Sequence, residues 1–210
     1  MNGFMRRALF AAITAVAITG AVAAPASAGI LTASETNCGD ETLTQPFARF
    51  GDRANYKLVA GGSFESGTTG WTVTRGAKVV SGNEPWKVGG AGHGKSLVLP
   101  AGSTAISPIS CVGLAEPTLR FFVKKNRAPL LGISTLVVSV HVKTSLGLTV
   151  PVPVGVVLAN GQWKPSPTML IVANLLPLLP GDRTPVRFQF TPVLGDWQID
   201  DVYVDPARMR

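Results

Sequence analysis

Hydrophobic and polar residues alternate along much of this chain, a pattern typical of β-strands. The alternation is clearest at 138–143, where three valines lie on one side and Ser139, His141 and Lys143 on the other. Glycine, proline, asparagine and serine separate such stretches at short intervals. We expect strands within 56–65, 71–81, 95–99, 104–112, 119–124, 138–143, 148–158, 168–173, 185–191 and 195–205. Many short strands without helices predict an all-β fold, a two-sheet antiparallel jelly-roll β-sandwich.

The segment 195–205 carries two adjacent carboxylates, Asp200 and Asp201, inside an aromatic and β-branched run. Aspartate is uncommon within strands, because a buried carboxylate must find hydrogen bonds or a cation. Strict alternation would put Ile199 and Val202 on opposite faces of the sheet. A one-residue bulge at the aspartate pair would instead place Ile199, Val202 and Val204 together in the core. The sequence leaves both arrangements open.

Residues 1–28 have the features of a signal peptide: Arg6 and Arg7, then an apolar run, then Ala-Ser-Ala at 26–28. We expect cleavage there, export by the general secretion route, and a secreted, extracellular protein associated with the cell envelope. The apolar run is too short for a transmembrane segment. About 180 residues remain, enough for one domain. We expect an N-terminal arm at 29–56 and the jelly-roll sandwich at 57–210.

Cys38 and Cys111 are the only cysteines. Exported proteins fold in an oxidising compartment, so we expect a disulfide that ties the arm to the sandwich. A disulfide that closes this loop of about 74 residues should stabilise the fold by roughly 4 kcal/mol. A pair of free thiols is the alternative, and catalysis by either thiol is not indicated, because no Cys-x-x-Cys motif or nearby histidine partner is present.

Several function classes find little support in the sequence. The net charge of +7 is scattered, with one cluster at 124–127, so no nucleic-acid partner is expected. Residues 89–96 match the phosphate-loop pattern G-x-x-x-x-G-K-S, but a strand ending at Pro100 follows where a helix is needed, so no nucleotide is expected. Catalytic motifs are missing, and Asp200 and Asp201 are poorly placed to flank one bond, so we expect no enzyme.

Three short motifs follow one another in order: Gly-Gly-Ser-Phe-Glu-Ser-Gly at 61–67, Gly-Trp-Thr at 70–72, and Trp-Gln-Ile-Asp-Asp-Val at 197–202. In this order the chain resembles the galactose-binding-like jelly rolls of secreted carbohydrate-binding modules, over residues 57–205. The resemblance implies a structural calcium ion held by Glu65 with Asp200 or Asp201. Calcium takes six to eight hard oxygen ligands, which suits carboxylates. The alternative is that these acids cap turns and pair with arginine or backbone amides.

The resemblance also implies carbohydrate binding, in which aromatic side chains stack on sugar rings. Among the four tryptophans, Trp86 lies in a polar loop, with Asn83, Lys87 and His93 close in sequence. We expect these four residues to contact the ligand, since loops expose what they carry. The alternative is that Trp86 folds over the edge of the sandwich and covers the core.

Two functions follow from these observations. In the first, the protein is a secreted non-catalytic module that recognises carbohydrate through loops at the edge of the β-sandwich. In the second, it is a structural or protein-interaction protein of the cell envelope without a sugar site. Exposed aromatic residues on a concave face would favour the first function, and their absence the second. The expected partner is accordingly a glycan or a cell-envelope component.

Overall fold

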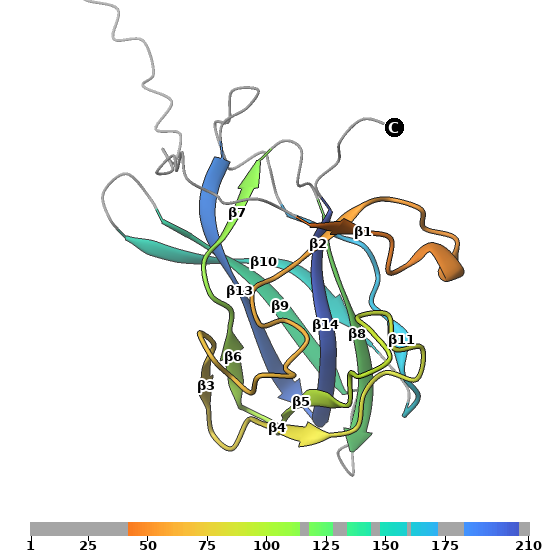
Figure 1. Ribbon diagram of the computed structural model, residues 1–210. Coiled ribbons are helices and arrows are strands. Elements are labelled where there is room, and N and C mark those ends of the chain that lie inside the picture. The colour runs from red at the N-terminus through yellow and green to blue at the C-terminus, as the bar shows by residue number, and fades with distance from the viewer. Residues whose placement is uncertain are drawn as a thin grey trace, which may run out of the picture.

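The chain is built almost entirely from β-strands (Figure 1). The computed structural model describes residues 42–205 apart from 114–117, 128–133, 144–147, 159–160 and 172–182. The strands are β1 (Leu43–Thr44), β2 (Tyr56–Leu58), β3 (Thr72–Thr74), β4 (Lys78–Ser81), β5 (Lys95–Leu99), β6 (Thr104–Ile106), β7 (Ser110–Gly113), β8 (Thr118–Arg127), β9 (Thr135–Lys143), β10 (Thr149–Val157), β11 (Lys164–Pro165), β12 (Met169–Leu170), β13 (Arg183–Leu194) and β14 (Asp196–Asp205). The one helical element within the described residues is the short 3-10 helix η1 (Ala48–Phe50). The all-β prediction is confirmed.

The strands form two antiparallel sheets, which we name after their central strands (Figure 1). In the β14 sheet, β14 pairs with β2 and β5 on one side and with β8 on the other, while β1, β4, β11 and β12 lie further out. The β13 sheet has the order β10-β9-β13-β6-β3, with β7 also paired to β13. The first strand of the predicted sandwich lies beside the last one, since Leu58 of β2 pairs with Tyr203 of β14. The predicted two-sheet sandwich is confirmed.

The main core lies between the two sheets and takes one side of each strand. In β9 the three valines Val138, Val140 and Val142 are buried in this core. Each of the larger apolar side chains buried there contributes about 1.5–3 kcal/mol relative to an exposed position. The same core contains the fully buried aromatic residues Phe64, Phe121, Phe188, Phe190 and Trp197. The period-two alternation of the sequence therefore corresponds to burial between the sheets.

Strand β14 contains a one-residue bulge at the aspartate pair. Between its pairs with Phe122 and Arg120 of β8, β14 has one residue more than β8. Asp201 has a φ of 47°, a backbone conformation that is uncommon for residues other than glycine. The bulge places three apolar residues of β14 together in the core: Ile199, Val202 and Val204. Of the two arrangements left open by the sequence, the bulged one is correct.

Residues 45–55, between β1 and β2, pack on the outer face of the β14 sheet and contribute to a second, smaller core. Phe47 is fully buried there, and its ring centroid lies 5.2 Å from that of Phe122 and 5.8 Å from that of Tyr203. The guanidinium carbon of Arg120 also lies over the Phe47 ring, 4.3 Å from its centroid. The described part of the predicted arm is therefore packed on the sheet.

An ion pair also holds the arm on the sheet. Asp52 Oδ2 lies 2.5 Å from Arg120 Nη1 and accepts a 2.6 Å hydrogen bond from the Tyr56 hydroxyl. Burial raises the pKa of Asp52, but hydrogen bonds from Tyr56, from the Ala54 amide and from Arg120 outweigh that effect and leave the pKa below its ordinary value. The carboxylate form of Asp52 therefore favours the folded state.

Replacing Asp52 with asparagine should lower the free energy of unfolding at pH 7 by about 1–3 kcal/mol. Because the folded pKa lies below the unfolded one, wild-type Asp52 stabilises the fold at pH values above its unfolded pKa of about 4. That contribution is lost as the pH falls through the folded pKa, so the difference between the two proteins should shrink below about pH 4. Urea unfolding of both proteins at pH 7, 5 and 3 measures this difference in the free energy of unfolding. A difference of the same size at pH 7 and pH 3 would contradict the ion pair.

Some sequence predictions lie outside the described residues: the signal peptide at 1–28, residues 29–41 of the arm, and Cys38. Cys111 lies in β7, and no cysteine among the described residues is free. Because Cys38 lies outside the described residues, the disulfide between Cys38 and Cys111 stays a prediction. No helix in the described ranges has both the length and the apolar character needed to cross a membrane.

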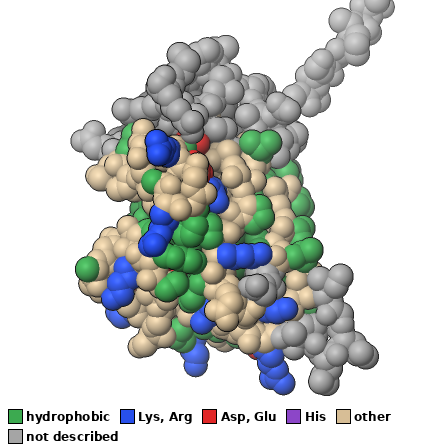
Figure 2. Space-filling model, turned by 90° about the vertical axis from the view of Figure 1, so that its right-hand side faces the viewer, with side chains coloured by type: hydrophobic (Ala, Val, Ile, Leu, Met, Phe, Trp, Pro, Cys, Tyr) green, Lys and Arg blue, Asp and Glu red, His purple; other side chains and the backbone are tan. Residues whose placement is uncertain are grey.

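The side of the molecule on which η1 and β11 lie is rich in cations. Figure 2 views this side and shows many lysine and arginine side chains around hydrophobic ones, with hardly any acidic side chain. Three of the described carboxylates are instead fully buried: Glu84, Asp200 and Asp201. Because these three acids are buried, they do not offset the positive charge of the lysine and arginine side chains on the surface.

Candidate functional site

Three buried carboxylates meet at the β14 bulge, beneath the loop of residues 84–93. Asp200 and Asp201 come from the bulge, and Glu84 lies near the start of the connection between β4 and β5. None of the three side chains has measurable exposure. Carboxylates in such positions need hydrogen bonds or cations to replace their hydration.

Backbone amides supply partners for two of the three. Glu84 accepts hydrogen bonds of 2.6 Å from the amides of Trp86 and Val88. Asp200 accepts from the amide of Glu84 at 3.2 Å and from the amide of Asp201 at 2.9 Å. These bonds attach the start of the loop to β14. The position of Trp86 thus depends on acidic residues buried beneath it.

Asp201 is different, because both of its carboxylate oxygens are buried and accept no hydrogen bond of good geometry. The nearest basic side chain in the described ion pairs is that of His93, whose Nδ1 lies 3.9 Å from Asp201 Oδ1. Burial, followed by the charges of Glu84 and Glu65, raises the pKa of Asp201 to about 7, although the Gly89 amide opposes part of this rise. The described partners of Asp201 therefore do not offset the cost of burying its carboxylate form.

The same causes act on Asp200. Burial, and then the charge of Asp201, raises the pKa of Asp200 to about 9, in spite of its two amide hydrogen bonds. Two adjacent buried acids therefore both favour binding a positive charge, whether a proton or a metal ion.

The structure brings the three predicted calcium ligands only partly together. Asp200 and Asp201 are adjacent, and Glu65 is near enough for its charge to raise the pKa of Asp201. However, Glu65 Oε1 accepts hydrogen bonds of 2.9 Å from the amides of Gly94 and Lys95. In the described part of the chain, no three acidic, histidine or cysteine side chains are arranged to hold a metal ion. The unpartnered oxygens of Asp201 suit a hard cation such as Ca²⁺, and calcium at Glu65, Asp200 and Asp201 stays a prediction.

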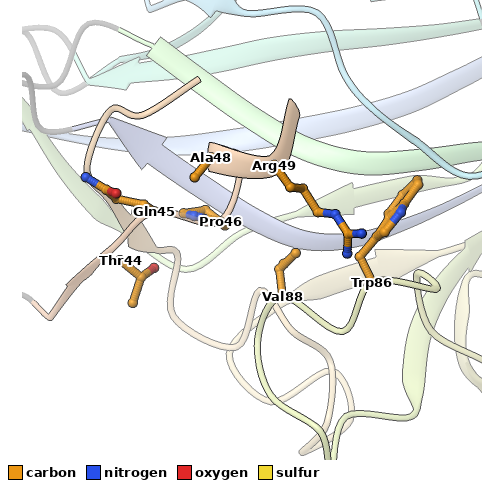
Figure 3. A pocket seen from close by; sticks show the side chains of 7 residues that line it. All are labelled: Thr44, Gln45, Pro46, Ala48, Arg49, Trp86 and Val88. Atoms are coloured by element: carbon orange, nitrogen blue, oxygen red, sulfur yellow. The ribbon is translucent and has the colours of Figure 1, made fainter. Parts of the chain in front are cut away.

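A hollow lies next to this loop, where the arm meets it. The hollow has a volume of about 330 Å³ and is lined by residues of both segments (Figure 3): Thr44, Gln45, Pro46, Ala48, Arg49, Trp86 and Val88. Arg49 reaches from η1 toward Trp86, and its guanidinium carbon lies 5.9 Å from the Trp86 ring centroid. The volume is at the low end of the range for small-molecule sites.

Trp86 belongs both to this hollow and to the smaller core. Its ring packs edge-on against Phe50, with centroids 4.8 Å apart, and at a tilt against Phe122 at 5.5 Å. Trp86 is therefore half-buried and covers the smaller core, as the alternative interpretation predicted. The remaining part of the ring borders the hollow.

Of the four predicted ligand contacts, only Trp86 borders the hollow. Asn83 and Lys87 donate side-chain hydrogen bonds to carbonyl oxygens of their own loop. His93 faces the buried Asp201. The structure thus separates these residues, and a ligand role for Asn83, Lys87 and His93 stays a prediction.

No pattern in the sequence indicated the residues of the arm that line the hollow. Gln45 and Arg49 lie far from Trp86 in the chain, in a segment that has no recognisable binding motif. They reach Trp86 because Phe47 and Phe50 pack onto the β14 sheet beside it. A tertiary contact, rather than a local pattern, therefore creates this hollow.

The glycine-rich segment 89–96 runs directly into β5. A phosphate loop needs a helix at this place, whose first amides face the phosphates. The described segment has none, in agreement with the strand expected from the sequence.

The outer face of the β13 sheet carries a network of polar side chains. His141 Nε2 lies 2.5 Å from Gln189 Oε1, and Gln189 Nε2 donates to the Thr191 hydroxyl at 2.9 Å. Among the described residues, the exposed large hydrophobic side chains are all aliphatic. The described residues of this face therefore present polar and aliphatic side chains, and none of them is an exposed aromatic residue that could stack on a sugar ring.

No protein-family model matches the chain, and no curated protein does. Solved structures with a similar fold include carbohydrate-binding modules. The xylan-binding CBM22-1 domain of Xyn10C from Paenibacillus barcinonensis is 15% identical, with a TM-score of 0.49 over 70% of this chain and 93% of that domain. The family 11 module of Lic26A-Cel5E from Clostridium thermocellum is 14% identical, with a TM-score of 0.43 over 73% and 96% of the two chains.

A third similar structure is the C-terminal CBM6 of LamC from Zobellia galactanivorans. It is 11% identical, with a TM-score of 0.44 over 72% of this chain and 99% of that module. At such identities and TM-scores, the function of this chain has to be argued from its own residues.

Proposed function

We propose that this chain is a non-catalytic module that binds carbohydrate in the hollow between η1 and Trp86, and that it acts outside the cell after removal of residues 1–28. The observation that carries the proposal is the composition of the hollow. Its lining combines the indole of Trp86 and apolar side chains with the polar groups of Gln45 and Arg49. A sugar ring needs the same combination, because it has an apolar face and polar hydroxyl groups at its rim.

The lining of the hollow also supports a binding role over a catalytic one. Glycoside cleavage needs two carboxyl groups on either side of the scissile bond. None of the seven residues that line the hollow is acidic. Asp200 and Asp201 lie beneath the loop, fully buried, and do not border the hollow.

Retention on insoluble polysaccharides tests the proposal. The Trp86→Leu variant keeps apolar contacts with Phe50 and Phe122 but removes most of the indole surface toward the hollow. Loss of a stacking contact should weaken retention by roughly threefold to tenfold. The unfolding midpoint of each variant, measured in parallel, reports any effect on the fold.

The Trp163→Leu variant is a matched control, because Trp163 packs against the same smaller core but does not line the hollow. Its retention should equal that of the wild type. Equal losses in both variants would assign the effect to the core rather than to a site. If the wild-type protein is retained on no glycan, the sugar-binding proposal fails and the envelope-protein alternative is left.

We also propose that a structural calcium ion binds at Asp201, with Asp200 and Glu65 as further ligands. The support is the pair of buried Asp201 oxygens without hydrogen-bond partners. Bound there, calcium would take the place of protons on the buried carboxyl groups beneath the 84–93 loop. Its role would be to hold that loop, and with it Trp86, on the β14 sheet.

A further inference from the structure

Arg49 is a cation without a partner among the described residues. It is exposed, and it makes no hydrogen bond or ion pair there. Its guanidinium carbon lies 5.9 Å from the ring centroids of both Phe50 and Trp86. Aromatic rings at this distance attract a guanidinium and limit the positions that it samples. Arg49 is therefore held at the hollow with its hydrogen-bond donors unused.

The described residues around Arg49 include few acidic side chains. Among the described residues that line the hollow, none is acidic. The described carboxylate of the arm, Asp52, is already engaged with Arg120 and Tyr56. Figure 2 shows lysine and arginine side chains spread over this side of the molecule with hardly any acidic one. The local potential therefore favours an anionic ligand.

Gln45 provides a different polar group. Its Nε2 donates to Arg53 O at 3.0 Å and to Asn55 Oδ1 at 3.2 Å, which fixes the amide. No described residue donates to its Oε1, which is therefore available to accept a hydrogen bond from a hydroxyl group. The hollow thus has charged donors at Arg49 and a neutral acceptor at Gln45.

We infer that the ligand is an acidic glycan, whose uronic acid carboxylate pairs with Arg49 while a ring hydroxyl donates to Gln45 Oε1. This inference rests on the proposed function and specifies its substrate class. A planar carboxylate matches the guanidinium fork and forms charge-assisted hydrogen bonds with it. The partly exposed ring of Trp86 contacts the apolar face of the sugar.

The geometry of Trp86 favours this class over neutral glycans. Phe50 and Phe122 pack against the indole, and Arg49 lies near it. Only part of the indole is left for stacking on a sugar ring. This contact therefore contributes less binding free energy than a fully exposed tryptophan would. The guanidinium is then the group best placed to provide affinity and to discriminate between ligands.

Affinity electrophoresis tests the inference with three probes, polygalacturonate, alginate and hyaluronate, each compared with its carboxyl-reduced form. The full-length secreted protein should bind at least one acidic polymer about tenfold or more tightly than the neutral form. Raising the salt concentration should weaken that binding. Arg49→Gln should lose about tenfold in affinity for the acidic form and little for the neutral form. The affinity of Arg49→Lys for the acidic form should fall between those of the wild type and Arg49→Gln, because lysine keeps the positive charge but lacks the planar guanidinium fork.

Lys78→Gln is the matched control, since Lys78 is an exposed cation of β4 outside the hollow. Its affinity should stay within about twofold of the wild type. Equal losses in Arg49→Gln and Lys78→Gln would indicate attraction to net charge and overturn the inference. Equal binding of the acidic and reduced polymers, or retention on neutral glycans alone, overturns the inference and leaves the proposed function intact. Retention on no glycan refutes both.

Discussion

Replacing Phe47 with alanine is expected to lower the free energy of unfolding by about 3–5 kcal/mol, the range typical of phenylalanine truncation in a packed core. Phe47 is fully buried among Tyr56, Phe122 and Tyr203, and it also contacts the Arg120 guanidinium. Truncation of the ring would remove its contacts with these residues and leave a cavity in the smaller core. Urea unfolding of the wild type and the variant measures the loss.

Leu170→Ala is the control for this experiment, because Leu170 is 67% exposed. It should change the free energy of unfolding by less than about 0.5 kcal/mol. The Phe47→Ala variant should also lose glycan retention, since the arm carries Gln45 and Arg49 to the hollow. If the Phe47→Ala variant were as stable as the wild type, packing of the arm against the β14 sheet would not contribute to the free energy of unfolding.

Calcium should raise the thermal unfolding midpoint of protein that has been stripped with chelator. A ligand that binds only the folded state stabilises it by about 2.7 kcal/mol at a concentration one hundred times its dissociation constant. The Asp201→Asn variant should lose this response, because the amide replaces one of the two unpartnered oxygens with a hydrogen-bond donor. Calorimetric scans with calcium and with chelator measure the shift.

Asp196→Asn provides the matched control for calcium binding. Asp196 lies at the start of the same strand, and its Oδ1 accepts from the Ala101 amide, which an asparagine oxygen can also do. This variant should keep the full calcium response. A wild-type midpoint that calcium leaves unchanged, together with a stabilised Asp201→Asn variant, would show that protons and not calcium neutralise these carboxylates.

The fold could be predicted from the sequence because burial on one side of a strand repeats every second residue. The valines of 138–142 indicate a strand with one buried face, and the structure buries them in the main core. The two aspartates required either exposure of a core residue or a bulge. The structure contains the bulge, because it keeps Ile199, Val202 and Val204 in the core.

The candidate site could be predicted only in part. The two aspartates attracted notice in the sequence because carboxylates are rare in strands. Glu84 gave no such signal, since an acidic residue in a polar loop is ordinary. Its burial depends on the amides of Trp86 and Val88, which only the folded loop presents to it.

The sequence by itself therefore determined the all-β class and the presence of two acids in the closing strand. These are consequences of local periodicity and of short motifs. Only the tertiary structure decided that the arm packs on the β14 sheet and that Arg49 and Gln45 join Trp86 around one hollow. Contacts between segments far apart in the chain depend on how side chains fit together in three dimensions, and no local pattern records that fit.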